Sequence, residues 1–184
     1  MFLRNLKNSI LESVETLLTS FIVLMTVYVL VAFPVEVSGS SMSPNLETGD
    51  RLLVEKLTQL FEGYNRGDIV VLHPPENDYI DYVKRIIGIP GDTIKIINCK
   101  ILISRDDTKF LLNEEIYLSP EVCTNGGKSL SEGRIYILKE NQFVVLGDNR
   151  DNSSDSRYFG IISEDRIQGK VVARMWPFEK VKLY

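Results

Sequence analysis

The chain has 184 residues and a formal net charge of −4, from 21 basic and 25 acidic side chains, and 44% of its residues are hydrophobic. This length fits one compact domain, or one domain with an appendage. The acidic balance argues against a nucleic-acid-binding protein, and the apolar content argues against wholesale disorder. Two cysteines, Cys99 and Cys123, are too few for a disulfide scaffold and lack CxxC spacing, and the single histidine, His73, excludes a multi-histidine metal site.

The apolar residues concentrate near the N-terminus, where residues 16–35 contain no charged side chain. Twenty residues in a helix span roughly 30 Å, which is the thickness of the hydrocarbon layer of a membrane. A buried core helix of this length would show a polar stripe, and a cleaved secretory signal would have a shorter apolar stretch and a small-residue cleavage motif. The sequence therefore predicts a retained transmembrane anchor at 16–35.

The charges that flank this segment predict its orientation. Arg4 and Lys7 place a short N-terminal segment, residues 1–15, in the cytoplasm, because basic residues count in the positive-inside rule and acidic residues contribute little. Residues 36–184 are then expected on the outer face of the cell membrane. Cys99 and Cys123 could oxidise there, but the sequence leaves their pairing open.

Beyond the anchor, short runs rich in Val, Ile, Leu and Tyr alternate with breaks that contain Gly, Pro and Asn. Such runs are typical of strands and turns rather than of βαβ units. The runs are residues 51–57, 68–73, 79–89, 93–103, 133–139, 142–149 and 170–176. We therefore expect a mostly antiparallel β domain over 36–184 behind a single N-terminal transmembrane helix. Polar loops between about 93 and 142 suggest an inserted hairpin or small cap.

The first polar segment of interest is residues 38–46, which directly follow the anchor and contain Ser41. A flexible Ser/Gly linker is one interpretation of this composition. However, a linker would gain nothing from Met42 and Leu46. An exposed serine held at a turn that glycine permits is suited to act as a nucleophile.

The second segment, residues 79–88, places Lys84 on a predicted strand. Alternate residues of a strand share a face, so Arg85 lies on the same side as Asp81, whereas no acid lies on the side of Lys84. The neighbours of Lys84 on its own side are Ile80, Tyr82 and Ile86. Lys84 is then either a lysine that covers apolar surface and keeps its ammonium in water, or a desolvated lysine with a lowered pKa that can act as a general base.

The third segment is the polar loop at 147–160. A calcium loop of the EF-hand type that starts at Asp151 is excluded. It would require glycine at the position of Ser156 and glutamate at the position of Ile162. A loop this polar between apolar strands is better suited to position hydroxyls and amides around a site.

The three segments together resemble the bacterial type I signal peptidase family. The matching blocks are SMxPxL at 41–46, YVKRIIGxPGD at 82–92 and GDNRDNSxDSR at 147–157. They occur in the family's order behind an N-terminal anchor and extend over most of residues 36–170. Any one block alone is a weak signal, but the combination is very specific.

The resemblance implies a role for each matching residue. Ser41 is similar to the family's nucleophile, and its backbone N–H is expected to stabilise the oxyanion. Lys84 is similar to the general base, and Ser153 to the serine that hydrogen-bonds this lysine and orients it. The remaining matches are a structural ion pair, Asp155 and Arg157, and four residues that line shallow substrate pockets, Met42, Leu46, Tyr82 and Val83.

One position departs from the pattern of some members of the family. Those members carry a serine two residues before the nucleophile, and its hydroxyl is a second oxyanion donor. Gly39 occupies that position here, as it does in other members. The second donor, from Ser38, Ser40 or a backbone amide, stays open.

The resemblance thus predicts a membrane-anchored serine endopeptidase that removes signal peptides from exported preproteins without a metal or cofactor. Its partners would be those preproteins and the lipid bilayer. A self-cleaving cytoplasmic repressor with the same chemistry would carry a DNA-binding helical domain where this chain has its apolar segment. A non-catalytic anchored β domain, the alternative from another class, predicts that Ser41, Lys84 and Ser153 lie far apart.

Overall fold

The computed structural model describes residues 2–61, 63–106 and 108–184, without the side chains of residues 2–8, 27, 29, 30 and 60. The predicted orientation in a membrane depends on Arg4 and Lys7, and both side chains lie outside the described ones. The chain divides into two compact units, residues up to 33 and residues 34–184.

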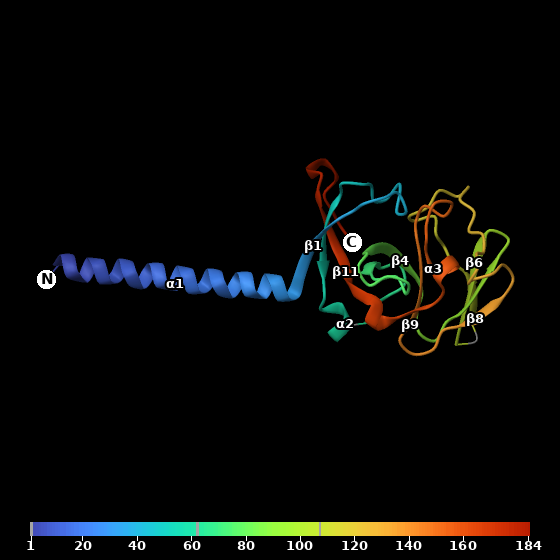
Figure 1. Ribbon diagram of the computed structural model, residues 1–184, viewed down its shortest axis with the longest axis horizontal. Coiled ribbons are helices and arrows are strands. Elements are labelled where there is room, and N and C mark those ends of the chain that lie inside the picture. The colour runs from blue at the N-terminus through green and yellow to red at the C-terminus, as the bar shows by residue number, and fades with distance from the viewer. Residues whose placement is uncertain (1, 62, 107) are drawn as a thin grey trace. The chain divides into compact units, whose positions relative to one another are not determined.

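The first unit is the helix α1, Phe2–Val31 (Figure 1). Among the described residues, it is the one helix that is long and apolar enough to cross a membrane, over Ser9–Thr26. The helix begins earlier than the predicted anchor, because residues 2–15 include three Leu, two Glu, one Lys and one Arg, which favour helix, and neither Gly nor Pro. It also ends earlier, because Pro34 lacks a backbone N–H and disfavours helix at the preceding residue, and Ala32–Glu36 form the strand β1.

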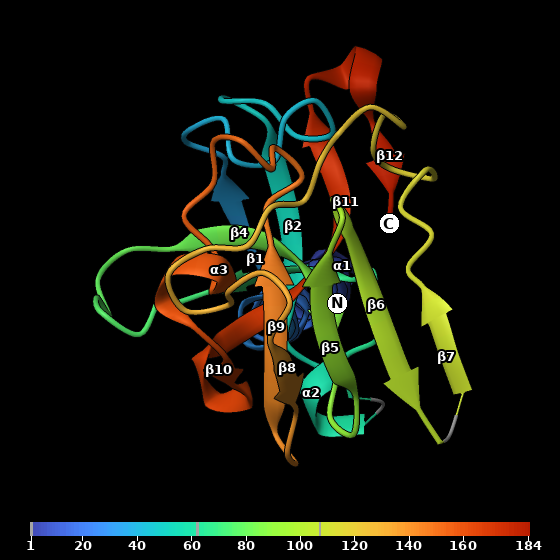
Figure 2. The ribbon, with the colours of Figure 1, turned by 90° about the vertical axis from the view of Figure 1, so that its right-hand side faces the viewer.

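The second unit is mostly antiparallel β, as the sequence predicts. The larger sheet has the order β1, β2 (Arg51–Glu55), β11 (Ile167–Trp176), β3 (Ile69–Leu72), β4 (Tyr82–Gly88), β9 (Gln142–Leu146) and β10 (Ile162–Ser163), with β12 (Lys182–Leu183) beside β11. The smaller sheet has the order β7 (Thr108–Leu111), β6 (Lys100–Arg105), β5 (Thr93–Ile97) and β8 (Ile135–Ile137) (Figure 2). Two single-turn helices, α2 (Thr58–Phe61) and α3 (Ser156–Phe159), lie between strands.

The run at 93–103 is two strands of the smaller sheet rather than one. β5 and β6 form an antiparallel hairpin in which Ile97 pairs with Lys100, so the turn consists of Asn98 and Cys99. Both turn residues have positive φ, +50° and +64°, which is the conformation that a two-residue hairpin turn requires. Cys99 forms a disulfide with Cys123, so the pairing that the sequence left open is present.

The strands β4 and β9 are buried on both faces, because each lies between two hydrophobic clusters. Ile86 and Val145 belong to one cluster, and Ile87 and Leu146 belong to the other. This is why the two strands contain nearly continuous apolar runs rather than an apolar–polar alternation. It also means that the polar side chains on β4 are buried whichever way they point.

Candidate active site

Ser41 and Lys84 are in direct contact. The ammonium nitrogen of Lys84, Nζ, lies 2.8 Å from the hydroxyl oxygen of Ser41, and it also donates to the carbonyl of Val83 at 3.0 Å. The Lys84 residue is only 3% exposed, and its Nζ lies 4.8 Å from the centre of the Tyr82 ring. A hydroxyl and a buried amine at this distance have the geometry of a nucleophile and its base.

Burial lowers the pKa of Lys84 from 10.5 to about 8, because the ammonium loses its hydration in the protein interior. The carboxylates of Asp155 and Asp148 act in the opposite direction and offset part of this shift. The sequence shows no acid on the Lys84 side of its own strand, but two carboxylates from outside the strand raise the lysine pKa. Strand alternation reveals only neighbours on the same strand, whereas both carboxylates come from the loop after β9. The sequence also predicts that Ile80 lies beside Lys84 on the same strand. Ile80 instead precedes β4 and is 47% exposed, so it does not belong to that face of the strand.

Ser40 and Ser41, in the turn that carries the candidate nucleophile, accept three hydrogen bonds from the loop after β9. The backbone N–H of Asn149 donates to the carbonyl of Ser41 at 3.0 Å. The side-chain amide of Asn149 donates to the carbonyl of Ser40 at 3.1 Å, and the amide of Asn152 donates to the hydroxyl of Ser40 at 2.9 Å. Within the described residues, the backbone N–H of Ser41 donates no hydrogen bond, so it is available to a ligand.

Ser153 is buried close to Ser41, but its hydroxyl has no hydrogen-bond partner among the described residues. A Cβ added at Gly147 would overlap both the Ser153 hydroxyl and the carbonyl oxygen of Ser41, so the three residues are packed around one point. The hydrogen bond that the sequence predicts between Ser153 and Lys84 is not formed. The orienting role of Ser153 stays a prediction.

Asp155 and Arg157 form a buried ion pair. The carboxylate of Asp155 accepts two hydrogen bonds from the guanidinium of Arg157, both at 2.8 Å, and a third from the backbone N–H of Gly147 at 3.0 Å. Asp155 also caps the N-terminus of α3 by accepting from the backbone N–H of Arg157. The pair therefore joins α3 to the loop that contacts Ser41.

Arg85 points to the other face of β4 and pairs with Asp148 rather than with Asp81. The two guanidinium–carboxylate hydrogen bonds are 2.8 Å and 2.6 Å long, and both side chains are buried. Asp81 lies instead 3.3 Å from the imidazole of His73. No role is assigned to Asp148 from the sequence. Its position, as a charged residue between an apolar strand and a polar loop, could have indicated that it pairs with a buried cation.

The four predicted pocket residues differ in exposure. Met42 and Leu46 are fully buried and Val83 is 9% exposed, whereas Tyr82 is half-buried. Met42 and Leu46 therefore fix the turn at residues 40–46, which we call the nucleophile turn, in the core. The pocket roles stay predictions.

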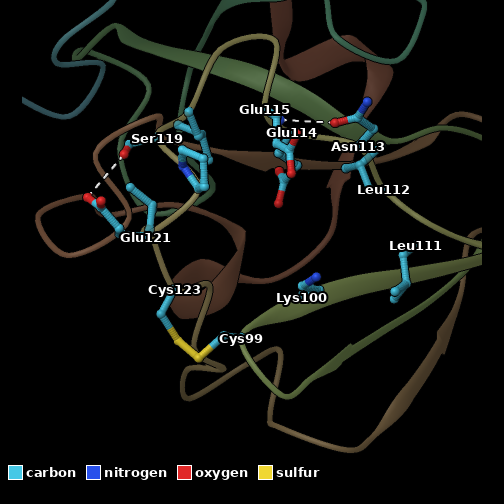
Figure 3. A pocket seen from close by; sticks show the side chains of 13 residues that line it. Cys99, Lys100, Leu111, Leu112, Asn113, Glu114, Glu115, Ser119, Glu121 and Cys123 are labelled. Atoms are coloured by element: carbon cyan, nitrogen blue, oxygen red, sulfur yellow. Dashed lines mark hydrogen bonds between the residues drawn. A yellow bond between two sulfur atoms is a disulfide. The ribbon is translucent and has the colours of Figure 1, made fainter.

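A separate cavity of about 390 Å³ lies beside the disulfide (Figure 3). Its described lining consists of residues 99–100, 111–115 and 118–123, and includes none of the predicted site residues.

Comparison with known proteins identifies the family. The profile of the family described as "Signal peptidase, peptidase S26" matches residues 10–176. The chain is 34% identical over 183 residues to signal peptidase IB of Staphylococcus aureus strain COL, covering 96% of this chain and 95% of the relative. It is 31% identical to the probable signal peptidase I-2 of Synechocystis sp., covering 96% of this chain and 78% of the relative. A solved signal peptidase I from Enterococcus faecalis V583 matches 59% of this chain and 97% of its own, with 26% identity and a TM-score of 0.46.

The family profile covers nearly the whole chain, and the Staphylococcus aureus relative is 34% identical over 95% of its length, which places the chain in the signal peptidase family, peptidase S26. The chain is thus a hydrolase of the signal peptidase I type, which acts on preproteins that carry signal peptides.

Proposed function

We propose that this protein is a membrane-anchored serine endopeptidase in which Ser41 is the nucleophile and Lys84 is the general base. The observation that carries the proposal is the 2.8 Å contact between the Ser41 hydroxyl and the amine of a lysine that is only 3% exposed. A serine hydroxyl is a weak nucleophile until a neighbouring base accepts its proton. A lysine can accept that proton only in its neutral form, and burial favours this form.

In the first half of the reaction, the hydroxyl oxygen of Ser41 attacks the carbonyl carbon of the scissile peptide bond while Lys84 accepts the hydroxyl proton. The resulting oxyanion is stabilised by the backbone N–H of Ser41, which has no hydrogen-bond partner in the described part of the chain. The Lys84 ammonium then gives its proton to the leaving amine. The carbon–nitrogen bond breaks, and the signal peptide is held as an ester on Ser41.

In the second half, a water molecule replaces the leaving amine. Lys84 is neutral again and accepts a proton from this water, whose oxygen attacks the ester carbonyl. The Ser41 oxygen leaves, takes its proton back from Lys84, and the signal peptide is released. Both halves need one lysine that changes its protonation state close to neutral pH.

The substrate is proposed to bind as an additional strand along the first residues of β4. Residues 82–84 pair with β3 on one side, but pairing with β9 begins only at Arg85, because β9 ends at Leu146 and continues into the loop. The other backbone edge of residues 82–84 is therefore unpaired in this sheet. An extended peptide can add there, with alternate side chains entering small pockets at Tyr82 and Val83.

The helix α1 is proposed to anchor the protein in the cell membrane, with the N-terminus in the cytoplasm and residues 36–184 outside. The apolar window Ser9–Thr26 has no buried residues within its unit, which suits a helix surrounded by lipid. Anchoring would keep the site near the bilayer surface, where the cleavage site of an exported preprotein emerges.

The test is cleavage of a preprotein in detergent by the wild type and by Ser41→Ala. Ser41→Ala is expected to be inactive with an unchanged thermal unfolding temperature, and cleavage at the wild-type rate would remove Ser41 from the mechanism. The matched control is His73→Ala, which is expected to cleave normally because His73 contacts Asp81 and not Ser41. A large loss of rate in a folded His73→Ala would favour a serine–histidine enzyme. A non-catalytic β domain would show no cleavage by the wild type.

A further inference from the structure

We define the catalytic loop as residues 147–155. The segment between β7 and β8 begins with a turn, residues 114–118, that contacts this loop. In this turn, the backbone N–H groups of Tyr117 and Leu118 both donate to the carbonyl of Glu114, at 3.0 and 2.8 Å. The turn borders the cavity of Figure 3, and Cys123, near the middle of the same segment, is joined by the disulfide to Cys99 of the β5–β6 hairpin. The segment is thus attached to the smaller sheet a few residues after the turn.

Glu114 forms an ion pair with Arg150, a buried residue of the catalytic loop. Its two carboxylate oxygens accept from the two terminal guanidinium nitrogens of Arg150, one of them at 3.1 Å. The side chain of Arg150 has no exposed surface and that of Glu114 is 13% exposed, so the pair is largely withdrawn from water. Among the described ion pairs, Glu114 is the acidic partner of this buried cation, and Asp148 adds a weaker electrostatic attraction.

Arg150 connects Glu114 to the residues around Ser41 by hydrogen bonds. Its third nitrogen, Nε, donates to the carbonyl of Gly147 at 3.0 Å. Gly147 is packed so closely that a Cβ would overlap the Ser153 hydroxyl and the Ser41 carbonyl. A displacement of the Gly147 peptide therefore displaces Ser41 or Ser153, because no free space can absorb it.

The same turn makes a second contact with the site. The carbonyl of Tyr117 accepts from the side-chain amide of Asn45 at 2.7 Å, and the ring of Tyr117 lies 4.1 Å from the guanidinium carbon of Arg85. Asn45 is on the nucleophile turn, and its amide also donates to Asp148 at 2.9 Å. The Tyr117 hydroxyl donates to Glu114 at 2.7 Å, which ties the two contacts together.

We infer that Glu114 is a positioning residue for signal peptide cleavage, which acts through Arg150 and Gly147 on the geometry of Ser41. This inference rests on the proposed function of Ser41 and Lys84. Removal of the Glu114 carboxylate leaves the guanidinium of Arg150 buried without its counter-charge, so Arg150 and the Gly147 peptide must rearrange. A shift of about 1 Å at a reacting group can lower the rate by about 100-fold.

The experiment compares the full-length Glu114→Ala and Glu115→Ala variants in steady-state cleavage of a preprotein. Glu114→Ala is expected to lower kcat at least about tenfold with KM changed less than about twofold, since the substrate strand at β4 is untouched. The midpoint of the rising pH dependence of kcat/KM is expected to move to higher pH. Water that enters a loosened site would hydrate the Lys84 ammonium and so raise the pKa of Lys84. Glu115→Ala, at the exposed neighbouring position, is expected to behave as the wild type.

Two further variants decide whether Glu114 acts through Arg150. Arg150→Ala is expected to give a similar loss of kcat, and the double variant no greater loss than the more impaired single variant. A wild-type kcat and pH limb in Glu114→Ala, or losses that multiply in the double variant, would overturn the inference. If Glu114→Ala is too unstable to assay, Glu114→Gln replaces it in the same comparisons, because it keeps the shape and removes the charge.

The inference and the proposed function fail in different ways. Ser41→Ala, assayed beside these variants, is inactive if the proposed function holds. An inactive Ser41→Ala together with an unimpaired Glu114→Ala would refute the role of Glu114 alone.

Discussion

Cleavage by this protein is expected to rise with pH along a limb that Lys84 sets. Only the neutral amine can accept the proton of Ser41, so the rate follows the neutral fraction of Lys84. The pKa of Lys84 is lowered from 10.5 to about 8 by burial, against the opposing carboxylates of Asp155 and Asp148. At pH 7, this shift raises the neutral fraction from about one in 3,000 to about one in ten, roughly a 300-fold gain.

The assay is the pH dependence of kcat/KM for preprotein cleavage in detergent between pH 6 and pH 10. We expect a tenfold rise for each pH unit below about 8 and a plateau above it. Lys84→Ala is expected to be inactive, and so is Lys84→Arg, because a guanidinium does not release its proton in this range. A midpoint near 10.5, or an active Lys84→Arg enzyme, would show that Lys84 is not the base.

The same pKa shift lowers the free energy of unfolding in a pH-dependent way. Between about pH 8 and 10.5, the unfolded chain binds a proton at Lys84 that the folded chain does not bind, so stability falls as the pH decreases through this window. Below about pH 8 the full penalty, on the order of 3 kcal/mol, is present. Lys84→Met keeps the apolar stem and removes the charge, so it is expected to unfold at higher denaturant concentration at pH 7, with the gain vanishing above pH 10.5. An equal gain at both pH values would refute this linkage.

Three further outcomes are expected. Gly147→Ala should lower activity at least about 100-fold and stability by about 2 kcal/mol, because its Cβ overlaps Ser41 and Ser153; Ser154→Ala, on the same loop, is the control, and a fully active Gly147→Ala would contradict the packing. Replacing Cys99 and Cys123 by serine should lower the free energy of unfolding, measured with denaturant, by about 3 kcal/mol, since the disulfide joins residues 24 apart. A wild type that is equally stable with and without reductant would contradict this. Substrates with alanine at the first and third positions before the cut should be cleaved faster than those with leucine or phenylalanine, and equal turnover would show that the pocket assignment is wrong.

The elements of this protein were predictable because they depend on local patterns. Apolar runs between Gly, Pro and Asn breaks predict the strands of an antiparallel domain, and an uncharged apolar stretch predicts a long N-terminal helix. Boundaries were less predictable, as the helix Phe2–Val31 and the hairpin within 93–103 show. Helix ends and two-residue turns depend on backbone conformations at single residues, which a window of hydropathy averages out.

The sequence alone also singled out Ser41 and Lys84, through short blocks that resemble a known family. That these residues are in contact, although they lie 43 positions apart, was decided by the packing of the nucleophile turn on β4 and the catalytic loop. Alternation along β4 correctly placed Lys84 and Arg85 on opposite faces, but it could not show which groups reach each face from other elements.

The partners of the buried charges were decided only by the tertiary structure. Arg85 pairs with Asp148, Arg150 pairs with Glu114, and the Ser153 hydroxyl has no partner in the part of the chain that the structure describes. None of these outcomes follows from residue spacing. The physical reason is that burial obliges each charge to find a counter-charge, while sheet register and loop packing determine which one is within reach. Local sequence therefore determined which residues are proposed to carry the chemistry, and long-range packing determined the groups that hold them in place.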